Sequence, residues 1–178
     1  MSKEVWRLGN QINNDLKHRR VLLYPGSFDP PTSGHHNIAL RGLKLCDLLV
    51  IGIHMESSSK SYMFTAEERR EMFLSYFNEA EKQNMRVDLY EGLTAEYASK
   101  IGALGLLRGL RTNADFEFEF QMAAMNKHLN PQLETVFIRT EGGLAHVSSS
   151  LVKDVLRYRD VTGMVSDFVA DKVRAKFC

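Results

Sequence analysis

The stretch Val21-Leu22-Leu23-Tyr24-Pro25-Gly26-Ser27-Phe28-Asp29-Pro30-Pro31-Thr32-Ser33-Gly34-His35-His36 decides how the rest of the chain is interpreted. Its first four residues form an apolar run that is too short for a helix and is bounded by Pro25-Gly26, which predicts a strand followed by a turn. Thr32 or Ser33 can cap a helix whose apolar stripe follows at Ile38, Leu40, Leu43 and Leu45. The stretch therefore predicts a strand, a tight turn and the start of a helix.

This arrangement is suited to binding an anion. A strand that ends in a glycine turn and opens a helix presents unpaired backbone N–H groups and the positive end of the helix dipole, and phosphate is the usual ligand. Gly34 permits close approach of a ligand to the backbone, and His35 can donate a hydrogen bond to a phosphoryl oxygen. The alternative is a loop glycine followed by a capping histidine, and this stretch alone does not choose between the two.

The composition predicts one globular domain. The chain has 178 residues, of which 44% are hydrophobic and 25% charged, and its formal net charge is +1. This balance gives no electrostatic argument for a nucleic acid or a membrane surface as a partner. No apolar run is long enough to span a bilayer, and Cys46 and Cys178 form neither a disulfide framework nor a metal-ligand pattern. We therefore expect a cytoplasmic protein.

Apolar runs alternate with helical patterns along the chain. Residues 1–19 predict an amphipathic helix, which we interpret as an N-terminal extension to a single domain at 20–178. Further strands are predicted at 48–53, 86–90, 103–107 and 134–138, and further helices at 65–77, 93–101, 114–129, 148–158 and 167–177. The alternation indicates an α/β fold: a Rossmann-like, doubly wound sheet of five parallel strands with helices on both faces and closing C-terminal helices.

The polar residues that are candidates for binding a ligand all follow predicted strands. In an open parallel sheet, ligands bind beyond the carboxyl ends of the strands, at the point where the strand order reverses. Candidates gather there from four places along the sequence: Ser27 and His35 after the first strand, Lys60 after the second, Arg108 and Arg111 after the fourth, and Ser148 to Ser150 after the fifth. Arginine guanidinium groups match phosphate oxygens in bidentate geometry, which again favours a phosphate-bearing ligand.

Each of these residues also has a purely structural interpretation. Arg108 and Arg111 can form surface salt bridges with Asp115, Glu117 or Glu119. Lys60 can be a solvated lysine in a polar loop, and the three serines can simply cap the helix that they open. For Phe118 and Phe120 we expect a place in the core.

Several motifs resemble one enzyme family. Thr32-Ser33-Gly34-His35 is similar to the T/H-x-G-H signature of the nucleotidyltransferase superfamily, and Tyr24 to Pro30 resembles the opening of the phosphopantetheine adenylyltransferases. The block from Arg108-Gly109-Leu110-Arg111 through Asp115-Phe116-Glu117-Phe118-Glu119 to Leu129 resembles one that is specific to that family. Lys60 stands at the position of the family's loop lysine, Tyr62 stands where the family often has proline, and Val147-Ser148-Ser149-Ser150 resembles an Ile-Ser-Ser-Ser motif.

The resemblance implies a set of site residues. His35, Lys60 and Arg108 would be catalytic, and the acceptor would be bound by Ser27, Lys60, Thr94 and Arg108. The nucleotide would be bound by Ser27, Phe28, His35, Gly109, Leu110, Arg111, Glu119, Val147, Ser148, Ser149 and Ser150. No metal-ligating residue is predicted, although Mg²⁺ is expected to accompany ATP.

The resemblance also implies the reaction and the assembly. The 4′-phosphate of phosphopantetheine would attack the α-phosphorus of ATP directly in line, which gives dephospho-coenzyme A and pyrophosphate, a step of coenzyme A biosynthesis. A homohexamer and feedback binding by coenzyme A would follow from the same resemblance. Two alternatives stay open: another small-acceptor nucleotidyltransferase, such as a mononucleotide adenylyltransferase, and a non-catalytic nucleotide-binding regulator on the same fold.

Overall fold

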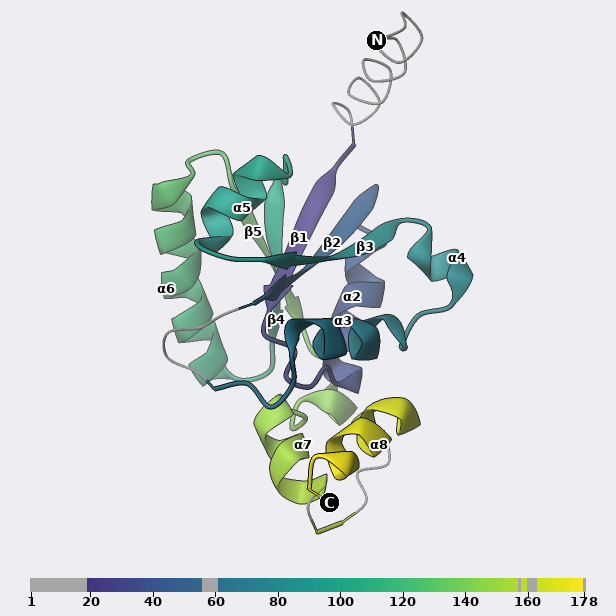
Figure 1. Cartoon of the computed structure of the whole chain (residues 1–178). Helices are drawn as coiled ribbons and strands as arrows, with labels where there is room; N and C mark the ends of the chain where they lie inside the picture. The colour runs from purple at the N-terminus through teal and green to yellow at the C-terminus, as the bar shows by residue number, and fades with distance from the viewer. Residues whose placement is uncertain (1–18, 56–60, 157, 160–162, 178) are drawn as a thin grey trace, which may run out of the picture.

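The structure is a computed structural model that describes residues 19–55, 61–156, 158–159 and 163–177 (Figure 1). Nearly all of the predicted N-terminal extension (1–18) and the loop lysine Lys60 lie outside the described residues. Within them, no helix combines the length and the apolar character that crossing a membrane requires.

Five parallel strands form one sheet, as the alternating pattern predicted. Their order is β3-β2-β1-β4-β5, so the chain winds outward in one direction from β1 and then crosses over to β4 on the other side. The register places Val21 of β1 beside Leu48 of β2, and Leu22 of β1 beside Gly105 of β4. The strands are β1 Val21–Gly26, β2 Leu48–His54, β3 Met85–Tyr90, β4 Gly105–Leu110 and β5 Glu134–Arg139.

Helices connect the strands and cover the sheet on both faces (Figure 1). Alternate residues of each strand point to opposite faces: Leu22 and Tyr24 pack in the core under α2 and α3, whereas Val21 and Leu23 pack against α5. The helices are α2 Ser33–Gly42, α3 Ala66–Leu74, α4 Glu79–Lys82, α5 Thr94–Lys100, α6 Asn113–Leu129, α7 Ser149–Leu156 and α8 Asp167–Ala175, with a 3₁₀ turn η1 at Gly142–Leu144.

The last two helices form a separate apolar cluster at one end of the sheet. Figure 1 shows α7 and α8 together below α3. Val152, Val169 and Val173 are fully buried there, and the cluster extends to Phe64, just before α3, and to Met72, near the end of that helix. The sheet and this C-terminal unit therefore have distinct cores that meet around the loops after β1 and β2.

The structure corrects several predicted details. Helix α2 ends at Gly42, so Leu45 lies beyond it and is 47% exposed. Strand β4 continues to Leu110, which places Arg108 and Gly109 inside the strand. The core assignment of Phe118 and Phe120 is wrong: their side chains are 61% and 59% exposed on α6. The alternation of Phe with Glu from 116 to 120 spreads these rings around the helix, and β4 and β5 cover only one side of it.

Arg69 joins the ends of the first two strands. Its side chain is 1% exposed, and the aromatic ring of Tyr62 lies 4.2 Å from its guanidinium carbon. The guanidinium donates to five backbone carbonyl oxygens, those of Ser27 at 2.7 Å, His54 at 2.9 Å, Phe64 at 3.2 Å, and Met55 and Thr65 at 3.3 Å each. One buried cation therefore holds the turn after β1, the end of β2 and the start of α3 in fixed relation.

We expect Arg69→Met to lower the free energy of unfolding by about 3–5 kcal/mol, because it leaves buried carbonyl groups without donors. Arg70→Met is the matched control: Arg70 is exposed on the same helix, and its loss should change stability by about 0.5 kcal/mol or less. Urea unfolding of both variants measures the difference. Equal stability of the two variants would show that Arg69 has no such structural role.

Candidate active site

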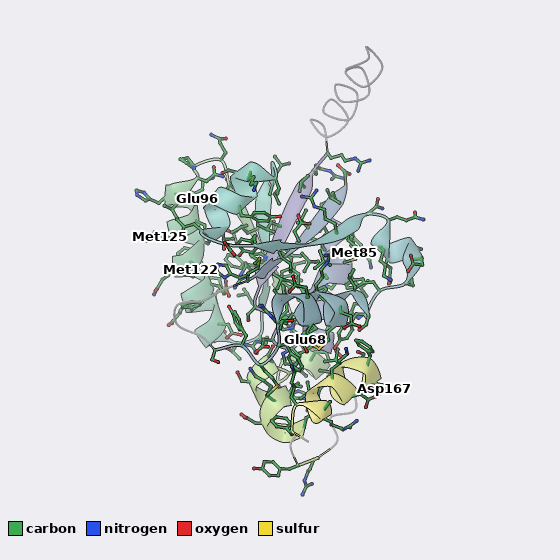
Figure 2. All side chains as sticks on the ribbon, in the orientation of Figure 1. Glu68, Met85, Glu96, Met122, Met125 and Asp167 are labelled. Carbon is green, nitrogen blue, oxygen red and sulfur yellow. The ribbon has the colours of Figure 1, made fainter. Side chains whose placement is uncertain are left out.

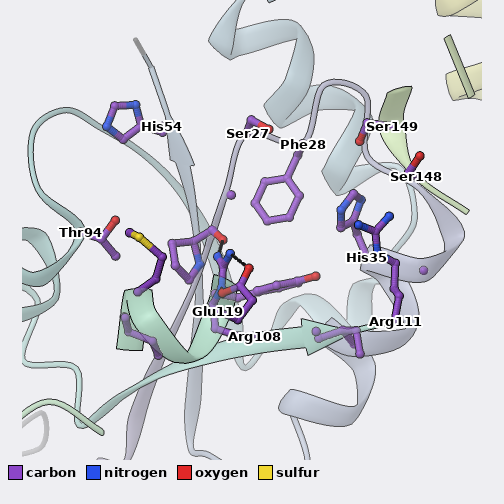
Figure 3. A pocket seen from close by; sticks show the side chains of 18 of the residues that line it. Ser27, Phe28, His35, His54, Thr94, Arg108, Arg111, Glu119, Ser148 and Ser149 are labelled. Atoms are coloured by element: carbon purple, nitrogen blue, oxygen red, sulfur yellow. Dashed lines mark hydrogen bonds and ion pairs between the residues drawn. The ribbon is translucent and has the colours of Figure 1, made fainter. Parts of the chain in front are cut away.

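A cavity opens at the carboxyl ends of the strands, where β1 and β4 separate (Figure 3). Its volume is about 640 Å³. Residues predicted from five separate segments line it together: Ser27, Phe28, His35, Thr94, Arg108, Gly109, Arg111, Glu119, Val147, Ser148, Ser149 and Ser150. Leu110 ends β4 but is not among the lining residues, and Lys60 lies outside the described part of the chain.

The turn after β1 is shaped by Phe28. This residue has a positive φ of 49°, which a side chain other than glycine rarely adopts, and it folds the ring back over Gly26. A Cβ atom at Gly26 would lie 2.7 Å from the ring, so this position requires glycine. The Phe28 ring packs edge-on against Phe73 and His35, with centroid distances of 4.7 and 5.1 Å. Phe28 is thus a buried wall of the cavity that supports the His35 ring.

His35 is both a helix cap and a candidate hydrogen-bond donor. Thr32 is the N-cap of α2, and its backbone N–H donates to Nδ1 of His35 at 3.0 Å in a capping box. Since Nδ1 accepts this bond, a neutral ring carries its proton on Nε2. The two interpretations that the sequence left open are therefore compatible: the cap orients the ring and leaves Nε2–H as its donor.

The surroundings keep His35 neutral. Burial disfavours the charged imidazolium, and the positive charges of Arg111 and Arg108 add to that effect, so the pKa of His35 falls to about 4. At neutral pH the ring can donate a hydrogen bond without carrying a charge.

Arg108 and Glu119 form an ion pair inside the cavity (Figure 3). Arg108 Nε donates to Glu119 Oε2 at 2.6 Å, Nη2 donates to Glu119 Oε1, and Nη1 donates to the carbonyl oxygen of Pro25 at 2.7 Å. Burial alone lowers the pKa of Arg108, but the hydrogen bond and charge of Glu119 outweigh it and the pKa lies above its usual value. The predicted salt bridge is present, and the paired guanidinium still lines the cavity.

The opposite wall carries a second arginine and the start of α7. Arg111 Nε donates to Asp115 Oδ2 at 3.0 Å, an i,i+4 pair. Ser148 Oγ accepts from the N–H of Leu151 at 3.1 Å, and Ser149 Oγ donates to the carbonyl oxygen of Pro30 at 2.8 Å. The serines therefore do cap and anchor the helix, as the structural interpretation expected, and all three line the cavity.

Several polar side chains gather at the far end of the cavity, and the sequence had predicted only one of them, Thr94. Thr94 opens α5, and its Oγ1 lies 3.0 Å from the Tyr90 hydroxyl. His54 Nε2 lies 3.0 Å from the carbonyl oxygen of Gly92, and its ring packs edge-on against Tyr90. His54, Tyr62 and Tyr90 line the cavity but were not predicted. His54 and Tyr90 end β2 and β3, so their strand-end positions were the available signal.

Asp29 was also missed as a site residue. The residue is buried, and its carboxylate accepts hydrogen bonds from two backbone N–H groups and from Lys153. The signal was an acidic residue inside a turn that is otherwise apolar or small, since a buried carboxylate requires partners.

The carboxylates in and beside the cavity each form an ion pair with an arginine. Glu119 pairs with Arg108, and Asp115 beside the cavity pairs with Arg111. Among the described residues, no group of three or more His, Cys, Asp or Glu side chains is placed to hold a metal ion. A cation that entered with a nucleotide would therefore take most of its ligands from phosphate oxygens and water, as Mg²⁺ commonly does.

The lowered pKa of His35 predicts a specific loss of stability in acid. Below about pH 6.5 the unfolded chain protonates this residue, whereas the folded chain does so only below about pH 4. The free energy of unfolding should therefore fall as the pH drops from about 6.5 to about 4. His35→Gln, which retains an acceptor for Thr32, should reduce that fall by roughly 1–3 kcal/mol. Urea unfolding at pH 7.0 and 4.5 tests this, and an identical fall in both proteins contradicts it.

Solved structures share this fold at low sequence identity. Nicotinic acid mononucleotide adenylyltransferase from Plasmodium falciparum, complexed with NaAD, matches with a TM-score of 0.58 and 15% identity, over 89% of this chain and 96% of that one. A bifunctional NMN adenylyltransferase/ADP ribose pyrophosphatase from Francisella tularensis matches with a TM-score of 0.63 and 10% identity, over 89% of this chain and 52% of that one. These likenesses establish the fold and leave the acceptor undetermined.

Sequence comparison is more specific. Residues 23–155 match a family model described as cytidylyltransferase-like. A phosphopantetheine adenylyltransferase from Caldanaerobacter subterraneus subsp. tengcongensis is 41% identical over 159 residues, 89% of this chain and 98% of that protein. Another from Thermomicrobium roseum is 41% identical over 165 residues, 91% of this chain and 96% of that protein. Identity of this extent over nearly the whole length decides the family: the chain belongs to the phosphopantetheine adenylyltransferases, within the cytidylyltransferase-like nucleotidyltransferases.

Proposed function

We propose that this protein transfers the adenylyl group of ATP to 4′-phosphopantetheine, which gives dephospho-coenzyme A and pyrophosphate. The observation that carries the proposal is the 41% identity to phosphopantetheine adenylyltransferases over nearly the full chain. The cavity supports it, because all of the residues assigned to the two substrates by the family resemblance, apart from Leu110 and the undescribed Lys60, line one space. The reaction belongs to coenzyme A biosynthesis, and we place it in the cytoplasm.

Two groups of residues divide the cavity between the substrates. Ser27 and Arg108, with Lys60, are assigned to the acceptor phosphate, and Thr94 to the pantetheine arm. Three of the five N–H donors of Arg108 are used within the described residues, so two others can serve an anion. The nucleotide is assigned to Ser27, Phe28, His35, Gly109, Leu110, Arg111, Glu119 and the segment Val147 to Ser150.

Catalysis by these residues consists of positioning and charge stabilisation. The acceptor phosphate itself is the nucleophile, so direct in-line attack on the α-phosphorus requires no covalent intermediate with the protein. His35 Nε2–H can donate to phosphoryl oxygens as negative charge shifts toward the departing pyrophosphate. We expect Mg²⁺ to enter with ATP and to neutralise part of the phosphate charge; Glu119 and Asp115 are the nearby carboxylates, each already paired with an arginine.

A panel of acceptors tests the function directly. The protein is incubated with ATP and Mg²⁺ and, in turn, with 4′-phosphopantetheine, nicotinamide mononucleotide and nicotinic acid mononucleotide, while pyrophosphate release is measured. Release with 4′-phosphopantetheine alone is the expected result. Release with a mononucleotide alone would favour the other adenylyltransferases of this fold, and ATP binding without any release would indicate a regulator.

Substitutions of the two arginines should separate the subsites. Arg108→Ala should weaken binding of 4′-phosphopantetheine at least about tenfold and change ATP affinity little, because Arg108 is assigned to the acceptor phosphate. Arg111→Ala should show the reverse preference. Isothermal titration calorimetry with each substrate measures both affinities, and the opposite pattern would mean that the two subsites are interchanged.

His35→Ala tests the role of the Nε2–H donor, and turnover is expressed per folded molecule because loss of the cap should cost about 1–2 kcal/mol of stability. Loss of one donor to a developing charge typically costs about 10²–10³ in rate, so turnover should fall at least about a hundredfold while ATP affinity stays near that of the wild type. His36→Ala is the control on the same helix and should change turnover per folded molecule by less than about threefold. Comparable losses in both variants would remove His35 from the mechanism.

We further propose that the protein assembles as a homohexamer and binds coenzyme A as a feedback ligand in the acceptor part of the cavity. Support for assembly comes from an exposed apolar stripe on α6, where Met122 and Met125 project from the helix (Figure 2). The stripe is completed by Phe118 and Leu129 at helical spacing, and all four residues are at least 43% exposed in the single chain. An uncovered stripe of this kind indicates a protein interface.

The double variant Met125→Glu/Leu129→Glu should dissociate the assembly, because charges would be buried at the contact. Sedimentation velocity at micromolar concentration is expected to give a hexamer for the wild type and smaller species for the variant. A wild-type monomer, or a variant that sediments like the wild type, contradicts this proposal.

A further inference from the structure

The carboxylate of Asp29 lies at a junction of three segments. Its side chain is 5% exposed, so its hydrogen bonds are made in a largely water-free environment. Oδ1 accepts from the backbone N–H of Phe64 at 3.0 Å, and Oδ2 accepts from the N–H of Met63 at 3.0 Å and from Lys153 Nζ at 2.9 Å. One side chain therefore connects the turn after β1, the segment before α3 and the helix α7.

Each of these three segments carries part of the candidate site. The turn after β1 holds Ser27 and Phe28, and the segment before α3 holds Tyr62, all of which line the cavity. Helix α7 begins at Ser149, directly after Ser148, and Ser149 and Ser150 form its first turn. Ser27, proposed for the acceptor phosphate, and Ser149 and Ser150, proposed for the nucleotide, thus lie on segments that Asp29 connects.

Helix α7 contacts the turn through two residues on the same side of the helix. Lys153 pairs with Asp29, and Ser149, four residues earlier, donates to the carbonyl oxygen of Pro30 at 2.8 Å. Residues four apart lie one above the other on a helix, so both contacts fix the same face of α7 against the turn. The contacts set how far α7 stands from the turn and how it is rotated.

The link joins two segments that are anchored in different cores. The turn after β1 is anchored in the sheet core through Phe28, whereas α7 is anchored in the C-terminal cluster through Val152 and Leu156. Other bonds also join the two units: Ser33 N–H donates to the carbonyl oxygen of Met164 at 2.8 Å, and the Tyr76 hydroxyl contacts Pro31 and Ser166. Loss of Lys153 should therefore shift α7 locally and leave the unit docked.

We propose that Asp29 and Lys153 are positioning residues that align the bound acceptor phosphate with the triphosphate for in-line transfer. The inference rests on the adenylyl transfer proposed above and adds two residues to it. Neither residue needs to touch a substrate. Their pair holds the two substrate-bearing segments together, and a misplacement of about 1 Å can cost about 10²-fold in the rate of a transfer reaction.

This role has a distinct kinetic signature. In Lys153→Met each segment keeps its own substrate contacts, so the dissociation constants of ATP and of 4′-phosphopantetheine, measured separately by calorimetry, should change by less than about threefold. Alignment of the two substrates is lost, so kcat should fall at least about tenfold. Lys153→Arg keeps the positive charge beside Asp29 and should restore kcat to within about threefold of the wild type.

Two further variants keep the test decisive. Asp29→Asn/Lys153→Met removes both charges, so it avoids an unpaired buried carboxylate if Lys153→Met folds poorly. Its kcat should be at least as low as that of the single variant, because the ion pair is lost in both and an amide can accept only one of the two backbone N–H bonds. Lys172→Met removes a comparable lysine of α8, which forms an exposed ion pair with Glu71 of α3. This variant should keep wild-type kcat. Circular dichroism and thermal melting confirm folding of every variant.

The outcomes separate the inference from the function on which it rests. Absence of pyrophosphate release by the wild type with 4′-phosphopantetheine overturns the proposed function and the inference with it. A wild type that turns over, combined with wild-type kcat in Lys153→Met or in the double variant, overturns the inference alone. It is also overturned if kcat falls only in proportion to a loss of folded protein, or if affinity for either substrate falls as much as kcat.

Discussion

The buried guanidinium of Arg69 is the interaction on which the site depends. It occupies the space between the ends of β1 and β2 and donates to five backbone carbonyl oxygens at the ends of these strands and at the start of α3. Backbone polar groups at strand ends must find partners when they are buried. Arg69 supplies these partners from one rigid, planar group, so the loops can leave the sheet at fixed angles without secondary structure of their own.

The charges around the cavity form a consistent arrangement. Arg69 is surrounded by carbonyl oxygens, and Arg108 and Arg111 each face a carboxylate. His35, close to both cavity arginines, stays neutral because burial and their positive charges lower its pKa to about 4. An anionic substrate therefore meets two guanidinium groups, each paired with a carboxylate, and a neutral imidazole that can contribute a directed hydrogen bond.

The capping box of α2 shows how one residue can satisfy both a structural and a chemical requirement. Thr32 and His35 exchange hydrogen bonds that any helix start needs. In a capping box with glutamate at this position, the carboxylate has no N–H group to offer a ligand. An imidazole that accepts through one nitrogen can still donate through the other. The cap thus fixes the orientation and the tautomer of His35, and the remaining Nε2–H is available to a ligand.

Local patterns determined the elements of this protein. Periodicity, caps and turn residues predicted five parallel strands with helices on both faces, and the motif around His35 with the block after Arg108 indicated the family that the relatives then confirmed. Local patterns did not determine where each element ends. Strand β4 continues through Arg108 and Gly109 because its pairing with β5 extends to Leu110 and Arg139, which are 29 residues apart in sequence.

What the tertiary structure alone decided are the contacts between distant segments. The aromatic residues Phe118 and Phe120 were expected in the core, but whether a helix face is covered depends on elements elsewhere in the chain. The sequence assigned no role to Asp29, Lys153 or Arg69, and only packing brings Asp29 to Lys153 and Arg69 to the ends of two strands. Sequence specifies which groups can pair; burial, which comes from the whole fold, makes pairing obligatory because an unpartnered charge away from water is too costly.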